Sequence, residues 1–376
     1  MPSDPNARVS FPRLDGLRAL CFISVFFSHG FYTEDQTLLV HPVRHFVKGF
    51  LFASGDLGVN VFFVLSGFLI TFLLLREREV TGSVHVGHFW MRRVLRIWPL
   101  YFACVAFGFL GFPLIKSALG QVPNEHAEPL YYLFFAGNFD VLFHGLPDSS
   151  CLAVLWSIAV EEQFYLVWPI LLFLLPHRAY PWTFGAIFIS SLAFNLAVHD
   201  SRTTFFHTFS CMGDLAMGAC GAWLLARPST ALWIGRWPGW CVMLINFSFL
   251  GLYLARSPLA GAGASEGLLR AAIAFNAMLV VISQAGSKTR WGMIPDWRAL
   301  NYLGRISYGL YCLHPIGILA AIQCLRMAGM DHHVWQIILL QPVLAFGITV
   351  AIAATSHRFY ESPFLGLKTR FAKITR

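Results

Sequence analysis

The chain has 376 residues, of which 57% are hydrophobic and only 12% are charged. Soluble domains carry about 25% charged residues, so this composition excludes an ordinary soluble protein and indicates an integral membrane protein. The net charge of +8 does not indicate nucleic-acid binding, because the lysines and arginines lie in expected membrane-flanking loops. The eight cysteines have neither the pattern of a disulfide framework nor the spacing of metal ligands, and no metal site is expected.

Ten stretches are apolar and long enough to be membrane-spanning helices, which need about 20 residues each. They cover residues 14–32, 57–75, 97–115, 156–175, 182–198, 205–225, 240–254, 268–284, 306–324 and 335–355. Residues 130–142 are apolar but too short to span, and Asn138 and Asp140 favour a re-entrant or interfacial position for them. No repeat or second domain is visible. We therefore expect an all-α, polytopic membrane protein with a single domain over residues 1–376.

The basic residues predict the orientation of these helices. With the N-terminus in the cytoplasm, most of the 27 lysines and arginines fall in cytoplasmic segments, as the positive-inside rule requires. Acidic residues such as Glu34 and Glu125 then fall outside. Both termini are therefore expected in the cytoplasm. The first apolar segment does not have the form of a cleavable signal peptide, because it contains Asp15 and Arg18.

The first expected span contains three ionisable residues, Asp15, Arg18 and His29. Such groups are costly at membrane depth unless they are paired or hydrated, so they are candidates for function. Arg18 and His29 share one helix face, and eleven residues separate them by roughly 16 Å along the axis. The alternative is that Arg18 extends to the membrane surface and His29 only packs.

The fourth expected span places several polar residues on one face. Ser157, Glu161 and Tyr165 recur at intervals of four residues, which aligns them along a helix. With the predicted orientation, Glu161 lies at a depth similar to His29. A carboxylate beside an imidazole would orient it and raise its basicity, as a general base requires. Alternatively, Glu161 and Glu162 only cap the helix N-terminus at the membrane interface, where negative charge is favourable. This interpretation fits Glu162 better than Glu161.

Two further clusters are candidates for binding. Arg93 and Arg96 enter the third span from the cytoplasm on one face, where two guanidinium groups can bind phosphate oxygens. The alternative is ordinary positive-inside flanking. In the ninth span, Ser307, Tyr311 and His314 share a face. Since a proline follows His314, this histidine could instead mark a helix kink.

Together these segments resemble the acyltransferase-3 family of membrane-bound acyltransferases. The matching segments follow the family order along almost the whole chain: Arg13–Ala19 with His29, Gly58–Ile70, Arg92–Pro99, Trp156–Pro169, Ser307–His314 and Arg358–Phe364. No motif position departs from the family pattern. The resemblance implies about ten helices and transfer of an acyl group from acyl-coenzyme A to a hydroxyl, usually that of a sugar.

The resemblance also implies roles for individual residues. His29 matches the essential histidine and Glu161 the acidic residue of the fourth span, which makes them the expected catalytic pair. Coenzyme A phosphates are expected on Arg18, Arg93 and Arg96, with help from Arg92. Substrate-binding or supporting roles are expected for Asp15, Ser66, Trp156, Ser157, Glu162, Tyr165, Tyr311 and His314. Acyl-coenzyme A, expected to be acetyl-coenzyme A, is a co-substrate, and no permanently bound cofactor is expected.

The sequence therefore predicts an O-acyltransferase of the bacterial cytoplasmic membrane that acetylates a cell-envelope or secreted glycan or glycolipid. His29 would either deprotonate the acceptor hydroxyl or carry the acyl group itself, and both routes stay open. Many relatives carry an extra extracytoplasmic domain, whereas this chain is expected to be a standalone form, because it stops about twenty residues after its last span.

Three other functions are consistent with a polytopic membrane protein. An acyltransferase for a lipophilic small molecule remains an alternative. A proton-coupled transporter also uses buried ionisable residues, but it would predict inverted repeats, and the sequence shows none. A structural scaffold explains the ionisable residues least well. Asp214, in the sixth span, is expected to pair with an arginine and not to take part in catalysis.

Overall fold

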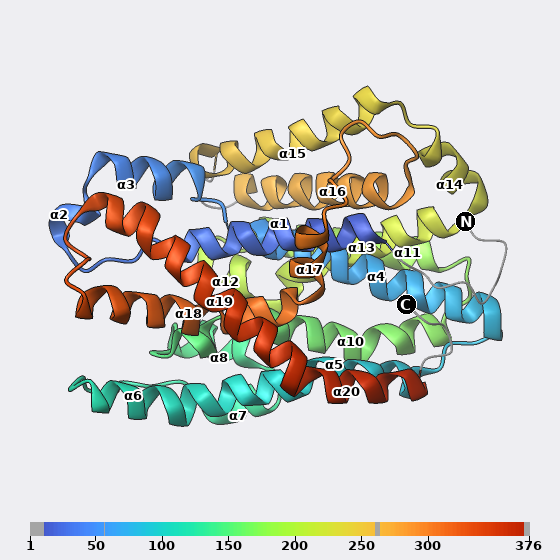
Figure 1. Ribbon diagram of the computed structural model, residues 1–376. Coiled ribbons are helices and arrows are strands. Elements are labelled where there is room, and N and C mark those ends of the chain that lie inside the picture. Colours follow the sequence, from blue (N-terminus) through green and yellow to red (C-terminus); the bar gives the residue numbers. More distant parts are fainter. Residues whose placement is uncertain (1–10, 56, 260–263, 372–376) are drawn as a thin grey trace.

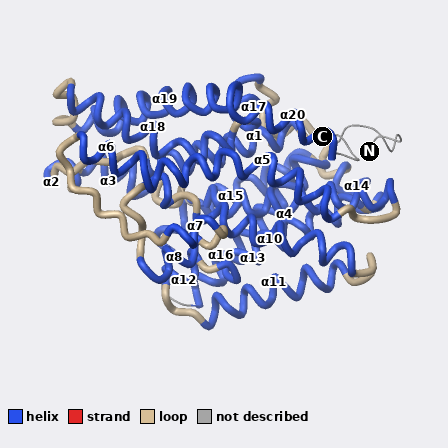
Figure 2. The backbone as a smooth tube through the Cα atoms, turned by 90° about the horizontal axis from the view of Figure 1, so that it is seen from below, coloured by secondary structure: helices blue, strands red, loops and turns tan. Residues whose placement is uncertain are grey.

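The structure is a computed structural model that describes residues 11–55, 57–259 and 264–371. All regular elements in this described part are helices, so the expected all-α fold is confirmed (Figure 2). Eight helical segments are long and apolar enough to cross a membrane: Leu57–Thr81, Val86–Ala118, Ser150–Leu174, Ser201–Ala226, Gly239–Arg256, Ser265–Gly286, Ser307–Met327 and Gln336–Leu367. A polytopic membrane fold follows from their length and hydropathy.

The long helices form a bundle in which most run along a common direction, while α19 crosses the bundle obliquely (Figure 1). They are α1 (Pro12–His29), α4 (Leu57–Thr81), α5 (Val86–Ala106), α10 (Trp156–Leu174), α11 (Tyr180–Ala197), α13 (Thr208–Ala226), α15 (Gly239–Leu259), α16 (Ala264–Gly286), α18 (Ser307–Met327) and α19 (Gln341–Ser356). The shorter helices are α2 (Gln36–Leu39), α3 (Pro42–Phe46), α6 (Phe112–Ala118), α7 (Pro129–Leu133), α8 (Gly137–His144), α9 (Ser150–Ala153), α12 (Ser201–Phe206), α14 (Pro228–Gly235), α17 (Arg298–Arg305) and α20 (Ser362–Leu367).

Each of the ten expected spans overlaps one long helix. Two of these, α1 and α11, have 18 residues each and are not among the eight apolar segments. The charged residues Arg13, Asp15 and Arg18 lower the hydropathy of α1. The helix of the third span begins earlier than expected, at Val86, because its first turns are amphipathic and not apolar. The number of membrane crossings stays a prediction.

The chain enters and leaves the bundle at the same end. In Figures 1 and 2, the start of α1 and the end of α20 both lie toward the end opposite α2 and α3. This is the arrangement that two termini on one side of a membrane require. That this end of the bundle faces the cytoplasm stays a prediction, which is based on the positive-inside rule.

The short apolar stretch at residues 130–142 forms two helices, α7 and α8, neither of which is long enough to cross a bilayer. Asn138, in α8, is fully buried and donates to the backbone oxygen of Phe206 at 3.1 Å and to the hydroxyl of Thr208 at 3.0 Å. The amide of Asn138 therefore joins this stretch to α12 and α13 and does not face lipid unpaired.

The centre of the bundle is α4, which packs closely against α13. Buried residues make up 89% of its most apolar stretch. A side-chain carbon on Gly67 of α4 would overlap the backbone oxygen of Leu215, and one on Gly218 of α13 would overlap that of Val64. Small residues at such positions let two membrane helices approach backbone to backbone.

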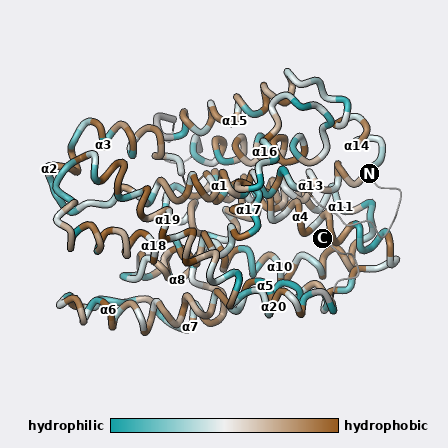
Figure 3. Tube along the Cα trace, in the orientation of Figure 1, coloured by the Kyte–Doolittle hydropathy of each residue, from teal (hydrophilic) through white to brown (hydrophobic). Residues whose placement is uncertain are grey.

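Peripheral helices show the opposite pattern. Only 6% of the apolar stretch of α15 is buried, and Trp240 and Phe247 on this helix are largely exposed. Figure 3 shows hydrophobic residues along α1, α18 and α19, and hydrophilic ones around α2. Exposed apolar surface of this extent fits contact with lipid chains.

Candidate active site

A chamber of about 80 Å³ lies between α1, α4, α5, α10 and α18. Because a space of this size holds several water molecules, it suits a small chemical group and not a whole nucleotide. Eight residues expected in the site line it: Arg18, Ser66, Arg93, Arg96, Ser157, Glu161, Tyr165 and Tyr311. We call this space the arginine chamber, after its three guanidinium groups.

The arginine chamber is strongly positive. Arg18 reaches it from α1, and Arg93 and Arg96, three residues apart, reach it from one side of α5. The guanidinium carbon of Arg93 lies 5.6 Å from the ring centre of Tyr165. Within the described part of the chain, none of these three arginines forms an ion pair with a carboxylate. Partly buried positive charges without a carboxylate partner among the described residues make the chamber suited to an anionic or strongly polar ligand.

Glu161 is held by two hydroxyl groups in the wall of the chamber. One carboxylate oxygen accepts from Ser66 at 2.6 Å and the other from Tyr165 at 3.0 Å. The Tyr165 hydroxyl also lies 3.1 Å from that of Ser66. We expected Glu161 to orient His29, but the structure gives both of its oxygens these other partners. The expected Glu161–His29 contact therefore has to be corrected.

His29 is the last residue of α1 and is exposed. Its Nδ1 lies 2.9 Å from the backbone oxygen of Val25, one turn earlier. A carbonyl oxygen only accepts, so Nδ1 carries the hydrogen and Nε2 is the nitrogen with the lone pair. The backbone carbonyl of Val25 thus favours the form of His29 that a general base or a nucleophile needs.

One face of α18 connects the arginine chamber with His29. Ser307 and Tyr311 line the chamber, and the Tyr311 hydroxyl lies 2.7 Å from that of Ser157. His314 follows about one turn later, with its ring centre 5.8 Å from that of Tyr311 and 5.4 Å from that of His29. The polar face expected from the sequence therefore leads from the chamber to the exposed histidine.

Besides His29, His314 and Asp15, three further expected site residues lie away from the chamber wall. Arg92 forms an ion pair with Glu77 at 2.8 Å and does not line the chamber. Glu162 accepts a hydrogen bond from the indole of Trp98 at 2.9 Å. Trp156 packs its ring against neighbouring aromatic rings, among them Phe63, Phe205 and Phe206. For Arg92, rotation of about 100° per residue around α5 explains why it points away from Arg93.

Two other residues need comment. Asp15 lies in α1 where Gly304 of α17 packs directly against its backbone. Tyr308, which we did not single out from the sequence, lines the chamber and donates its hydroxyl hydrogen to the backbone oxygen of Ile97 at 2.7 Å. The sequence could have indicated Tyr308 only through its position next to Ser307. Tyr308 was missed because it falls outside the helix face defined by Ser307 and Tyr311.

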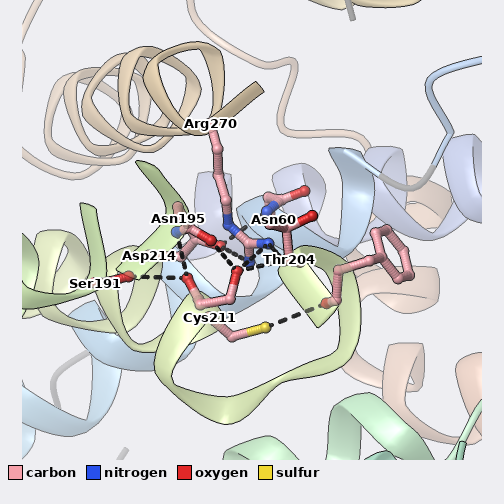
Figure 4. Close-up of polar contacts among 9 residues, drawn as sticks. Asn60, Ser191, Asn195, Thr204, Cys211, Asp214 and Arg270 are labelled. Carbon is pink, nitrogen blue, oxygen red and sulfur yellow. Dashed lines mark hydrogen bonds and ion pairs between the residues drawn. The ribbon is translucent and has the colours of Figure 1, made fainter. Parts of the chain in front are cut away.

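A second buried polar cluster surrounds Asp214 of α13 (Figure 4). One carboxylate oxygen accepts from Arg270 of α16 and from Asn60 of α4, both at 2.8 Å. Arg270 also donates to the backbone oxygen of Thr204 at 2.7 Å and to the hydroxyl of Ser210 at 3.1 Å. The expected pairing of Asp214 with an arginine is confirmed. Its partners make this cluster a link between three helices.

Long apolar helices surround a positively charged chamber, and a polar helix face joins this chamber to an exposed histidine. This arrangement is a candidate site for an anionic or strongly polar ligand within the bundle. The family model described as "Acyltransferase domain" matches residues 11–358. The chain therefore belongs to this acyltransferase family and is an integral membrane protein.

Several curated proteins are similar to this chain. Peptidoglycan O-acetyltransferase OatA of Listeria monocytogenes is 28% identical, over 95% of this chain and 56% of its own length. The putative peptidoglycan O-acetyltransferase YrhL of Bacillus subtilis is 26% identical, over 94% and 54%. O-acetyltransferase OatA of Staphylococcus aureus is 25% identical, over 94% and 57%. The chain thus spans about half the length of the curated relatives it matches. No solved structure matches it.

Proposed function

We propose that this protein is an O-acetyltransferase of the bacterial cytoplasmic membrane. It moves an acetyl group from cytoplasmic acyl-coenzyme A to a hydroxyl of a cell-envelope glycan, with peptidoglycan as the first candidate acceptor. The observation that carries this proposal is the arginine chamber, where Arg18, Arg93 and Arg96 gather without forming an ion pair within the described residues. The names of the relatives supply the acceptor class.

The chemistry of the donor fits the chamber. Coenzyme A carries phosphate groups, and guanidinium groups bind phosphate oxygens through paired, charge-assisted hydrogen bonds. The chamber is too small for the nucleotide, so the nucleotide would stay at the cytoplasmic end while the thioester arm enters. Tyr311 and His314 on α18 then mark the route toward His29.

The transfer step uses the lone pair of His29. In direct transfer, Nε2 takes the proton of the acceptor hydroxyl while its oxygen attacks the thioester carbonyl. The carbon–sulfur bond breaks with its electron pair on sulfur, and the proton passes from His29 to the thiolate. In the covalent route, Nε2 attacks the thioester carbonyl, and the carbon–sulfur bond breaks with its electron pair on sulfur. The acceptor oxygen then attacks the acyl-histidine, the carbon–nitrogen bond breaks with its electron pair on Nε2, and the hydroxyl proton passes to the thiolate. Both routes need the Nδ1–H form that Val25 fixes.

The test is acetyl transfer by the full chain in lipid nanodiscs, with radiolabelled acetyl-coenzyme A and soluble peptidoglycan fragments as acceptors. We expect base-labile label on the glycan with the native protein and none with His29→Gln, which keeps hydrogen bonding but is a poor proton acceptor. Substantial transfer by His29→Gln would remove the histidine from the chemistry. Labelling of a lipophilic alcohol but no glycan would assign the enzyme to small molecules.

A further inference from the structure

Two histidine rings from separate helices lie next to each other beside the polar face of α18. The rings of His29, on α1, and His314, on α18, have their centres 5.4 Å apart and their planes inclined by 43°. His29 is exposed, whereas His314 is only 1% exposed. Rings at this separation can bring two nitrogens to a hydrogen-bonding distance of about 3 Å.

Backbone carbonyls fix both rings in the same form. Nδ1 of His314 lies 2.7 Å from the backbone oxygen of Tyr311, as Nδ1 of His29 lies 2.9 Å from that of Val25. Each Nδ1 therefore donates, and each Nε2 keeps its lone pair. The Nε2 of His314 is buried and has no hydrogen-bond partner within the described part of the chain. A buried acceptor without a partner is rare and calls for an explanation.

Among the described residues, no hydrogen-bond partner lies beside this nitrogen of His314. Its ring packs at an angle against Phe22 and Phe26 of α1, with centres 6.2 and 6.5 Å away. Two neutral imidazoles that both present a lone pair cannot bond to each other. They can do so once one of the two Nε2 atoms carries a proton, and in apolar surroundings such a charge-assisted bond is strong.

We propose that His29 and His314 are a proton-sharing pair, in which His314 stabilises the protonated form of His29 during acyl transfer. This inference rests on the proposed function. When the acceptor O–H bond breaks, the proton moves to Nε2 of His29, and the new N–H donates to Nε2 of His314. The proton then leaves to the thiolate of coenzyme A, and both rings return to their neutral forms. His314 acts through His29 and is a positioning residue.

The first test compares two substitutions at one position. His314→Phe keeps an aromatic ring against Phe22 and Phe26 but has no acceptor, whereas His314→Gln keeps an acceptor and loses the ring. We expect kcat to fall about ten- to a hundredfold for Phe, the effect of losing one charge-assisted hydrogen bond, and to fall less for Gln. The KM for acetyl-coenzyme A stays the same for both. If the His314→Phe variant is as active as the native protein, or more active than the His314→Gln variant, His314 only packs and the proposal is wrong.

The second test is chemical rescue. His314→Ala leaves a space the size of an imidazole beside the exposed His29, so added imidazole should restore kcat in proportion to its concentration, while N-methylpyrrole, of similar shape but without a basic nitrogen, should not. Rescue by both compounds, or by neither, would overturn the proposal. The native protein and His29→Gln keep the tests separate. If the native protein transfers no acetyl group, the proposed function fails, and if the native protein is active, His29→Gln is inactive and His314→Phe is fully active, only the pair fails.

Discussion

Asp214 of α13 and Arg270 of α16 form a buried ion pair with a separation of 2.8 Å, although 56 residues separate them in the chain. The side chain of Asp214 is only 2% exposed, and Asn60 of α4 donates to the same oxygen. Three helices thus meet at one carboxylate. The cluster therefore holds three helices of the bundle together, and it is separate from the arginine chamber.

Loss of one member of this pair should be worse than loss of both. Arg270→Met leaves a buried carboxylate without its cation, and we expect it to lower the free energy of unfolding by about 3–5 kcal/mol. The double variant Asp214→Leu, Arg270→Met should recover most of this loss, because no buried charge remains. Thermal unfolding in detergent, followed by tryptophan fluorescence, measures both. A double variant less stable than Arg270→Met would contradict the explanation.

The contact between α4 and α13 should not tolerate a methyl group. Gly67→Ala places a carbon against the backbone of Leu215, so we expect a destabilisation of about 1–3 kcal/mol or more. Gly185→Ala, in α11, is the matched control, since no atom lies within 4 Å of the added carbon. It should leave the unfolding temperature unchanged or raise it slightly. Equal effects at the two positions would mean that helix propensity, and not close approach, sets the result.

The arginine chamber should account for donor affinity. Each charge-assisted hydrogen bond is worth about 1.5–3 kcal/mol, so Arg93→Ala and Arg96→Ala should each weaken acetyl-coenzyme A binding tenfold or more. Arg76→Ala removes the same charge outside the chamber, where Arg76 pairs with the exposed Glu79, and should bind normally. Calorimetric titration in nanodiscs gives the affinities. If the affinity is unchanged in the Arg93 and Arg96 variants, these arginines do not bind the donor and only determine the orientation of the helix in the membrane.

The orientation can be tested with reporter fusions. Fusions after Arg96 and after Arg305 should report the cytoplasm, because they follow arginine-rich segments. A fusion at the loop before Cys151 should report the outside. A cytoplasmic signal near Cys151 would falsify the ten-span arrangement and with it the placement of the donor site.

The sequence was sufficient for features that depend on one helix at a time. Hydropathy located the long helices, because a spanning helix must be apolar along its own length. Periodicity correctly placed Ser157, Glu161 and Tyr165 on one face of α10, and Ser307 and Tyr311 on one face of α18. It also indicated that Asp214 needs an arginine, although not which one.

The sequence was not sufficient for contacts between helices. We expected Glu161 to meet His29 because both lie at a similar depth, but depth does not say which helices are neighbours. The ring that adjoins His29 belongs to His314, on a helix almost 300 residues later in the chain. Similarly, Arg92 and Arg93 are adjacent in sequence, yet only Arg93 lines the chamber.

The enclosure of α4 has a consequence for how the protein is made. This helix is synthesised early, but its main neighbour α13 emerges well over a hundred residues later. On leaving the translocon, the glycine-lined face of α4 must first meet lipid, and it can leave lipid only when α13 arrives. Insertion and assembly are therefore separate stages in time. Two fragments divided in the loop before α12, produced together in one cell, should accordingly still find each other in the membrane.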